Sequence, residues 1–156
     1  MILIADSSAI IALAIINKLE VLEQLFGEVY VPQAVYDEIS KQDKAESEKL
    51  TKFCKDKTLN IITNINLNIT LGQGESEAII LYKERNADYF LCDDKKAKKF
   101  AKKFGVNVIG SLGILLKAKE KNLIKELKPL LNKLKNSEVF IDDKIFLEIL
   151  KIANEI

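Results

Sequence analysis

The chain has 156 residues, 48% of them hydrophobic and 30% charged, and its formal net charge is +1. This composition is that of a folded globular protein and excludes a disordered chain, and the length suffices for one domain with its own core. The sequence contains no histidine, which excludes the commonest general base, the usual zinc ligand and every Ser-His or Cys-His nucleophile pair. Any chemistry here would therefore use oxygen ligands.

Two further features concern the location of the protein. No apolar run approaches the roughly 20 residues that span a bilayer, and no positively charged segment precedes the apolar start, as in a secretory signal. We therefore expect a cytoplasmic protein with no membrane partner.

Cys54 lies in a charged stretch and Cys92 in an apolar run, which argues against a disulfide scaffold and predicts two free thiols with structural roles.

The first ten residues, MILIADSSAI, join an apolar run to a carboxylate and two hydroxyls. The continuous apolar stretch 1–5 predicts a strand buried on both faces, as in a parallel sheet. Ser7 or Ser8 can then cap a helix over the apolar residues 9–16. Ligands of α/β sheets bind outside the carboxyl ends of the strands, so Asp6 is a candidate for chemistry; the alternative is that it only helps to cap the helix.

A second strand and a helix follow further along the chain. Residues 29–31 predict the strand, and Pro32 suits the first turn of the helix, PQAVYDEIS. In this helix Val35 and Ile39 are four residues apart and share an apolar face. Glu38 lies beside that face, and we expect it at an edge of the core rather than out in solvent.

Residues 59–63 predict a third strand, and the polar stretch 64–70 predicts an irregular connector or a short helix. The next helix, over residues 75–85, opens with Glu75 and Glu77. Acidic residues are common in the first turn of a helix because they interact favourably with the helix dipole. In isolation, each of these two glutamates is therefore more simply explained as a residue that opens the helix.

Residues 89–92 predict a fourth strand, which ends in Asp93 and Asp94 and so repeats the arrangement at Asp6. The helix after it, KKAKKFAKKF, surrounds four apolar residues with six lysines. This pattern is typical of a solvated amphipathic helix, and the alternative is a helix that contacts phosphates. A fifth strand over residues 106–109 follows.

Strands and helices thus alternate along the chain, which predicts an α/β protein with a mostly parallel five-stranded sheet and right-handed crossovers. Residues 122–156 have a helical pattern, in which Asp142 and Asp143 are typical of an N-cap. No repeat or linker divides the sequence. We expect a single domain over residues 1–156, with a core of residues 1–121 and a C-terminal helical extension.

Acidic residues from four parts of the chain can meet in this topology. Asp6 and Asp93 or Asp94 end two strands, while Glu38 and Glu77 lie on helices that a doubly wound sheet can bring over the strand ends. Carboxylates this close repel each other by about 4 kcal/mol per pair at 4 Å and an effective dielectric constant near 20, so they need a cation. Magnesium or manganese matches oxygen ligands, and such a site suits phosphodiester hydrolysis.

The chain resembles PIN-domain proteins, the family of metal-dependent ribonucleases that includes VapC-type toxins. Four motifs carry this resemblance: ADSSAI around Asp6, VPQAVYDEI around Glu38, GQGESEAI around Glu77, and FLCDDKKAKKFA around Asp93 and Asp94. The later GSLGILLKAKEKNLI is similar to a small prokaryotic branch of the family. The resemblance covers roughly residues 1–121, and many PIN proteins carry Asp where Glu77 stands and Thr near Cys92.

The resemblance implies a three-layer α/β/α fold and a site that we assign residue by residue. The expected catalytic residues are Asp6, Glu38, Glu77 and Asp93, and the expected metal ligands are Asp6, Asp93 and Asp94, with Ser7 and Ser8 beside them. Comparison of the two strand ends favours Asp93 as the ligand and Asp94 as a helix cap, whereas alignment with a Thr-x-Asp pattern favours Asp94. Glu75 is expected only to open its helix.

The function that the resemblance implies is a Mg²⁺- or Mn²⁺-dependent endoribonuclease, the toxin of a toxin–antitoxin pair. Its expected partners are an RNA substrate, a small antitoxin protein and a second copy of the chain in a homodimer. Lys95, Lys98 and Lys102 are expected to contact RNA, because a negative site needs nearby cations to hold a phosphate backbone. The alternatives are a catalytically inactive PIN-like module that binds RNA or protein and, last, a receiver-like phosphoacceptor, whose paired acids would normally follow the first strand.

Overall fold

The computed structural model spans residues 1–156 and describes residues 1–63 and 71–156. The stretch 64–70, for which the sequence predicts an irregular connector or a short helix, lies outside the described residues. The strands are β1 (Ile2–Ala5), β2 (Glu28–Pro32), β3 (Thr58–Leu59), β4 (Tyr89–Leu91) and β5 (Val108–Ile109). The helices are α1 (Ser7–Ile15), α2 (Glu20–Phe26), α3 (Gln33–Lys41), α4 (Ser47–Cys54), α5 (Gln73–Glu84), α6 (Lys95–Lys103), α7 (Ser111–Glu120), α8 (Lys128–Lys135) and α9 (Asp143–Ile152).

The strands form one five-stranded sheet in the order β3-β2-β1-β4-β5, and every neighbouring pair in it runs parallel. The predicted α/β class is therefore confirmed. The third strand begins at Thr58, one residue earlier than predicted. It is also shorter than predicted, because its partner β2 ends at Pro32, opposite Leu59. β1 occupies the centre of the sheet, between β2 and β4.

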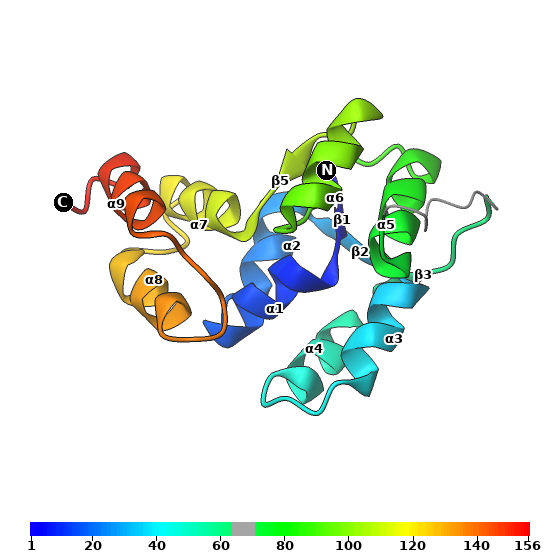
Figure 1. The fold of residues 1–156 in the computed structure, drawn as a ribbon, viewed down its shortest axis with the longest axis horizontal. Helices are drawn as coiled ribbons and strands as arrows, with labels where there is room; N and C mark the ends of the chain where they lie inside the picture. The colour runs from blue at the N-terminus through cyan, green and yellow to red at the C-terminus, as the bar shows by residue number, and fades with distance from the viewer. Residues whose placement is uncertain (64–70) are drawn as a thin grey trace.

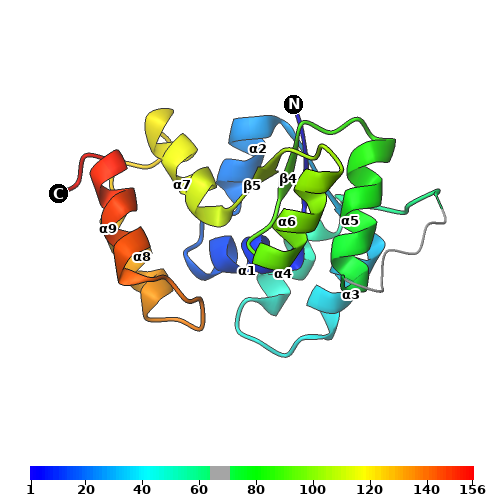
Figure 2. The ribbon, with the colours of Figure 1, turned by 45° about the horizontal axis from the view of Figure 1, so that its top comes forward.

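Helices cover both faces of this sheet (Figures 1 and 2). Side chains of β1 alternate between the faces: Leu3 and Ala5 join the core that includes α1, α2 and α7, while Ile4 joins the core with α5 and α6. The helices α8 and α9 lie at the end of the molecule opposite α5 (Figure 1) and add residues such as Leu131 and Leu150 to the first of these cores. The three-layer α/β/α fold is thus confirmed.

The helix caps correct one prediction and confirm two. Asp6, not Ser7 or Ser8, is the N-cap of α1, and its Oδ1 accepts a hydrogen bond of 2.7 Å from the Ser7 amide. Asp6 can cap because its backbone still has the extended conformation of the strand, whereas the two serines are already helical. As predicted, Asp94 caps α6 and Asp142 caps α9.

Cys54 and Cys92 are both buried free thiols, as predicted. None of the helices in the described part of the chain combines the length and the apolar character needed to cross a membrane.

Candidate functional site

The strands β1 and β4 end side by side at one edge of the sheet. Ala5 pairs with Leu91 in the ladder, and the Asp6 amide donates a hydrogen bond of 2.9 Å to the Leu91 carbonyl. The residues that follow the two strands are therefore neighbours in space. As the sequence predicts, Asp6 lies close to the segment that begins at Cys92.

Asp6 is a carboxylate that is only 2% exposed. Besides the Ser7 amide, its neighbours include the Cys92 thiol, whose Sγ donates to Asp6 Oδ2 at 3.6 Å. The pKa of Asp6 is raised to about 7: burial is the largest cause, the charges of Glu75 and Glu38 act in the same direction, and the two hydrogen bonds oppose them. A cation beside Asp6 would favour its charged form and reverse this shift.

Glu38 lies on α3 and faces the start of α1. The Ser7 hydroxyl donates a hydrogen bond of 2.9 Å to Glu38 Oε2. A Cβ atom at Gly74 would lie only 2.7 Å from Glu38 Oε1 and 3.2 Å from Val35 Cγ2, so the glycine allows α5 to approach α3 closely here. Glu38 is nevertheless exposed to solvent, so the expectation that it is shielded at an edge of the core is wrong. A substrate can therefore reach its carboxylate.

Glu75 is the acidic residue of α5 that lies among the other site carboxylates. Its Oε2 accepts a hydrogen bond of 2.6 Å from the Gly72 amide, which confirms its expected place in the opening turn of the helix. Burial raises the pKa of Glu75, and the charges of Asp94 and Glu38 raise it further, against the bond from Gly72 and the charge of Lys96. The sequence analysis missed that Glu75 joins this group of charges.

Glu77 is held against the start of α3. Its Oε1 accepts a hydrogen bond of 3.1 Å from the Ala34 amide, and its Oε2 accepts one of 3.2 Å from Gln73 Nε2. Residues two apart on an α-helix point about 200° away from each other, so Glu75 and Glu77 face different neighbours. The structure therefore places the two glutamates of GQGESEAI in different environments.

The two aspartates after β4 also differ. Asp93 uses both carboxylate oxygens on Ser111, accepting 2.7 Å bonds from its amide and from its hydroxyl, while the Asp93 amide donates to Ser8 Oγ at 3.3 Å. Asp94 Oδ2 accepts a bond of 2.8 Å from the Ala97 amide. Of the two, Asp94 is the aspartate whose charge raises the pKa of Glu75.

The role of Ser111 as a partner of Asp93 was not anticipated from the sequence. Ser111 is the first residue of α7, whose N-cap is Gly110. The sequence separation of 18 residues between Ser111 and Asp93 makes this a tertiary contact, which no local pattern reveals.

The lysine helix α6 starts at this site. A Cβ atom at Gly110 would lie 2.9 Å from Asp93 Oδ1 and 3.1 Å from Lys98 Nζ, so these two charged groups border the same small space. Lys95 and Lys102 are exposed on the same helix. One lysine of α6, Lys98, therefore lies beside a carboxylate of the site.

The chemistry of these side chains fits a hard divalent cation. Mg²⁺ keeps several water ligands and is often bound by only one or two carboxylates, and a buried carboxylate such as Asp6 gains from a nearby positive charge. Among the described residues, no three Asp, Glu or Cys side chains are close enough to hold a metal ion between them. A bound ion would thus take part of its coordination from water.

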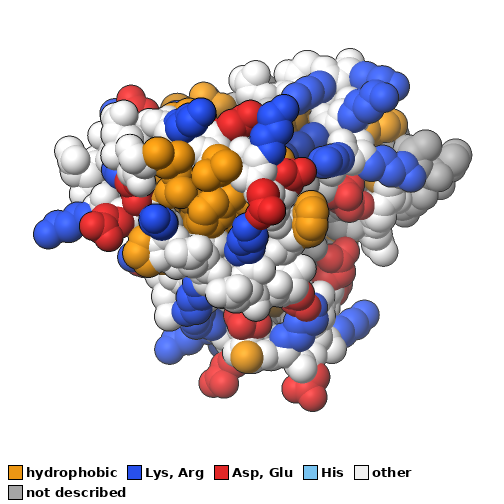
Figure 3. Space-filling model, turned by 60° about the vertical axis from the view of Figure 1, so that its left-hand side comes forward, with side chains coloured by type: hydrophobic (Ala, Val, Ile, Leu, Met, Phe, Trp, Pro, Cys, Tyr) orange, Lys and Arg blue, Asp and Glu red, His pale blue; other side chains and the backbone are white. Residues whose placement is uncertain are grey.

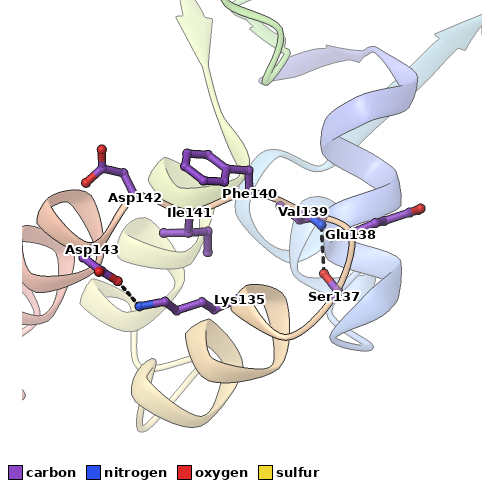
Figure 4. A pocket seen from close by; sticks show the side chains of 8 residues that line it. All are labelled: Lys135, Ser137, Glu138, Val139, Phe140, Ile141, Asp142 and Asp143. Atoms are coloured by element: carbon purple, nitrogen blue, oxygen red, sulfur yellow. Dashed lines mark hydrogen bonds and ion pairs between the residues drawn. The ribbon is translucent and has the colours of Figure 1, made fainter.

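A cavity of about 500 Å³ lies away from these carboxylates, between the end of α8 and the start of α9 (Figure 4). It is lined by Lys135, Ser137, Glu138, Val139, Phe140, Ile141, Asp142 and Asp143. Its charged groups already have partners: Lys135 pairs with Asp143, Glu138 pairs with Lys44 at 3.0 Å, and Asp142 caps α9. The carboxylates at the strand ends are therefore the stronger candidate for chemistry.

The chain was compared with known proteins. A family model described as a PIN domain matches residues 2–155, a span that includes β1, α3, α5 and α6 with all the side chains described above. No protein in the curated set matches the sequence significantly.

Proposed function

Since the chain belongs to the PIN-domain family, whose members are generally nucleases, we propose that it is a Mg²⁺- or Mn²⁺-dependent endoribonuclease. One observation carries this proposal most strongly. The carboxylate of Asp6, at the junction of β1 and α1, has a raised pKa chiefly because it is buried, and the nearby charges of Glu75 and Glu38 act in the same direction. This group of like charges is best explained by a cation that binds there.

The ion would bind beside Asp6 and complete its coordination with water, while Glu38, Glu75 and Asp94 add negative charge around it; when bound, it would lower the pKa of a water and stabilise the charge of the leaving oxygen. The protein contributes the orientation of these carboxylates. Ser7 holds one oxygen of Glu38, and the exposed position of Glu38 lets it accept a proton from an attacking water. Asp6 itself is shielded from solvent.

The lysines of α6 support RNA as the substrate. Lys98 borders the carboxylate site beside Gly110, and Lys95 and Lys102 are exposed on the same helix. Positive side chains next to a negative site can neutralise the phosphates on either side of the bond that is cut. The resemblance to VapC-type proteins supports a toxin role, in which a small antitoxin would block this site.

A second copy of the chain is the partner that we propose for the C-terminal helices. Figure 3 shows hydrophobic side chains gathered in a patch on this side of the molecule, bordered by lysine or arginine and by acidic side chains. Ile145 and Ile152 are exposed on α9, seven residues apart, and Ile152 shares a hollow with Leu116 of α7. A border with both signs of charge suits a two-fold dimer, in which the same surface meets itself. Ile152→Glu would then shift the protein to monomers in light scattering.

The central experiment is cleavage of single-stranded RNA by the purified protein with Mn²⁺ and with EDTA. EDTA and Asp6→Asn are each expected to reduce the rate at least about a hundredfold, since metal-ion catalysis contributes several kcal/mol. Asp142→Asn, at a helix cap far from the site, serves as the control. Cleavage that persists in EDTA contradicts the proposal, and metal binding without cleavage would favour the inactive RNA- or protein-binding module.

A further inference from the structure

The N-terminus of α3 is capped by a side chain from another helix. Its N-cap residue is Pro32, which makes no side-chain capping bond. The first amides of a helix need partners from outside it, and Ala34 finds one in Oε1 of Glu77, at 3.1 Å. A negative group at this position also interacts favourably with the helix dipole. Glu77 therefore does for α3 what a Ser, Thr or Asp N-cap normally does.

The same two helices touch again near Glu38, one turn along α3. Ala34 and Glu38 are four residues apart and share a face of α3, while Gly74 and Glu77 are three apart and share a face of α5. A Cβ atom at Gly74 would lie 2.7 Å from Glu38 Oε1 and 3.2 Å from Val35 Cγ2, so only a glycine leaves room for these side chains of α3 here. The Glu77–Ala34 bond therefore fixes how far α3 is shifted along α5 at the point where Glu38 stands.

Gln73 keeps the capping carboxylate in place. Its Nε2 donates to Oε2 of Glu77 at 3.2 Å, while Oε1 takes the Ala34 amide, so each oxygen has a defined partner. Glu75, on another side of the same helix, is instead among the carboxylates around Asp6. The two glutamates of the motif thus have different surroundings and separable tasks.

We infer that Glu77 is a positioning residue: by capping α3 from α5, it sets the place of Glu38 relative to Ser7 and Asp6. This inference rests on the proposed nuclease function and refines it. It differs from the sequence-based expectation that Glu77 is itself catalytic. The hydrogen bond needs an acceptor at Glu77 but not a charge, and this difference makes the inference testable.

Matched amide substitutions at the two glutamates separate the two roles. Glu77→Gln keeps a carbonyl oxygen for the Ala34 amide and should retain most of the cleavage rate, within about threefold. Glu77→Ala removes the acceptor and should lower kcat at least about tenfold, because small displacements of catalytic groups are costly. Glu75→Gln removes a site charge and should lose activity even though it is the same chemical change.

Two measurements do not depend on cleavage. Glu77→Ala should speed hydrogen exchange of the Ala34 amide about fivefold, which corresponds to about 1 kcal/mol at 1.4 kcal/mol per tenfold, whereas Glu77→Gln should not. Titration with Mn²⁺ alone should show weaker binding for Glu75→Gln and unchanged binding for Glu77→Gln. A thermal melt of each variant verifies that it is folded.

The inference is overturned if Glu77→Gln loses as much activity or Mn²⁺ affinity as Glu75→Gln, because a charge at Glu77 would then be required. It is also overturned if Glu77→Ala leaves Ala34 exchange and kcat unchanged. If no variant and no wild-type preparation cleaves RNA, the proposed function fails, and hydrogen exchange with Mn²⁺ binding still decides the role of Glu77.

Discussion

The hydroxyl group of Ser7 donates a hydrogen bond of 2.9 Å to Oε2 of Glu38, which joins the first residue of α1 to the middle of α3. This bond is exposed and adds little to global stability, but it restricts the orientation of a site carboxylate. We expect Ser7→Ala to lower the cleavage rate about two- to tenfold, the equivalent of one hydrogen bond, and to change the free energy of unfolding by less than about 0.5 kcal/mol.

Two controls accompany this measurement of cleavage rate. Ser7→Thr keeps the hydroxyl and should stay close to the wild type. Ser40→Ala removes a hydroxyl of α3 that donates to the Tyr36 carbonyl at 2.8 Å and should have no effect on cleavage. Equal losses in both alanine variants would show that the Ser7–Glu38 bond has no special role.

Asp6 makes the stability of the metal-free protein depend on pH. Its pKa is about 7 in the folded protein against 3.8 for the free side chain, so between these values the folded state binds more protons and stability falls as pH rises. At pH 8 in EDTA, Asp6→Asn should have a free energy of unfolding higher than that of the wild type by on the order of 2–4 kcal/mol. Urea unfolding measures this difference. The difference should shrink toward zero near pH 4. If Asp6→Asn is instead less stable than the wild type at every pH, Asp6 acts as a structural cap.

Asp93 and Asp94 should respond differently to the same change. Asp93→Asn weakens two bonds to Ser111 and should cost about 1–3 kcal/mol in urea unfolding while leaving measurable cleavage. Asp94→Asn keeps a good N-cap residue, should hardly change stability, and should lose Mn²⁺ affinity and cleavage. This expectation is opposite to the one from comparing strand ends, which favours Asp93 as the ligand; loss of cleavage in Asp93→Asn alone would support that earlier view.

The lysines of α6 should contribute to RNA affinity through their charge. Lys98→Gln and Lys102→Gln should each weaken binding of single-stranded RNA and reduce the slope of log affinity against log salt concentration by about 0.7. Lys133→Gln, on α8 in the C-terminal part, is the matched control and should behave as the wild type. Fluorescence anisotropy at several salt concentrations measures the affinity of all three variants. If the α6 variants have the same slope as the wild type, the lysines of α6 are solvated and do not contact RNA.

Much of the fold followed from local patterns. The apolar run 1–5 predicts a strand buried on both faces, and β1 is the central strand with Leu3 and Ile4 fully buried. The alternation of strands and helices predicted the parallel sheet, because parallel neighbours need crossover connections. The third strand was placed less well, since its length is decided by the end of β2 and not by its own residues.

The candidate site was only partly accessible from the sequence. The positions of Asp6 and of the pair Asp93 and Asp94 follow from strand ends, and these are local features. Which acid of a pair faces the site is not local: Glu75 and Glu77 differ by about 200° around α5, and either could have faced Asp6. The same holds for the two aspartates, because successive residues leave a strand on opposite sides.

The sequence by itself determined the parallel α/β fold and the edge of the sheet where carboxylates collect, because burial and periodicity depend on near neighbours along the chain. Only the tertiary structure decided that Glu75 joins Asp6 while Glu77 caps α3, and that Asp93 is bound by Ser111. These choices depend on how α5 docks on α3 and how α7 meets the end of β4. Such docking is set by contacts between residues 18 to 43 positions apart, whose geometry no stretch of sequence contains.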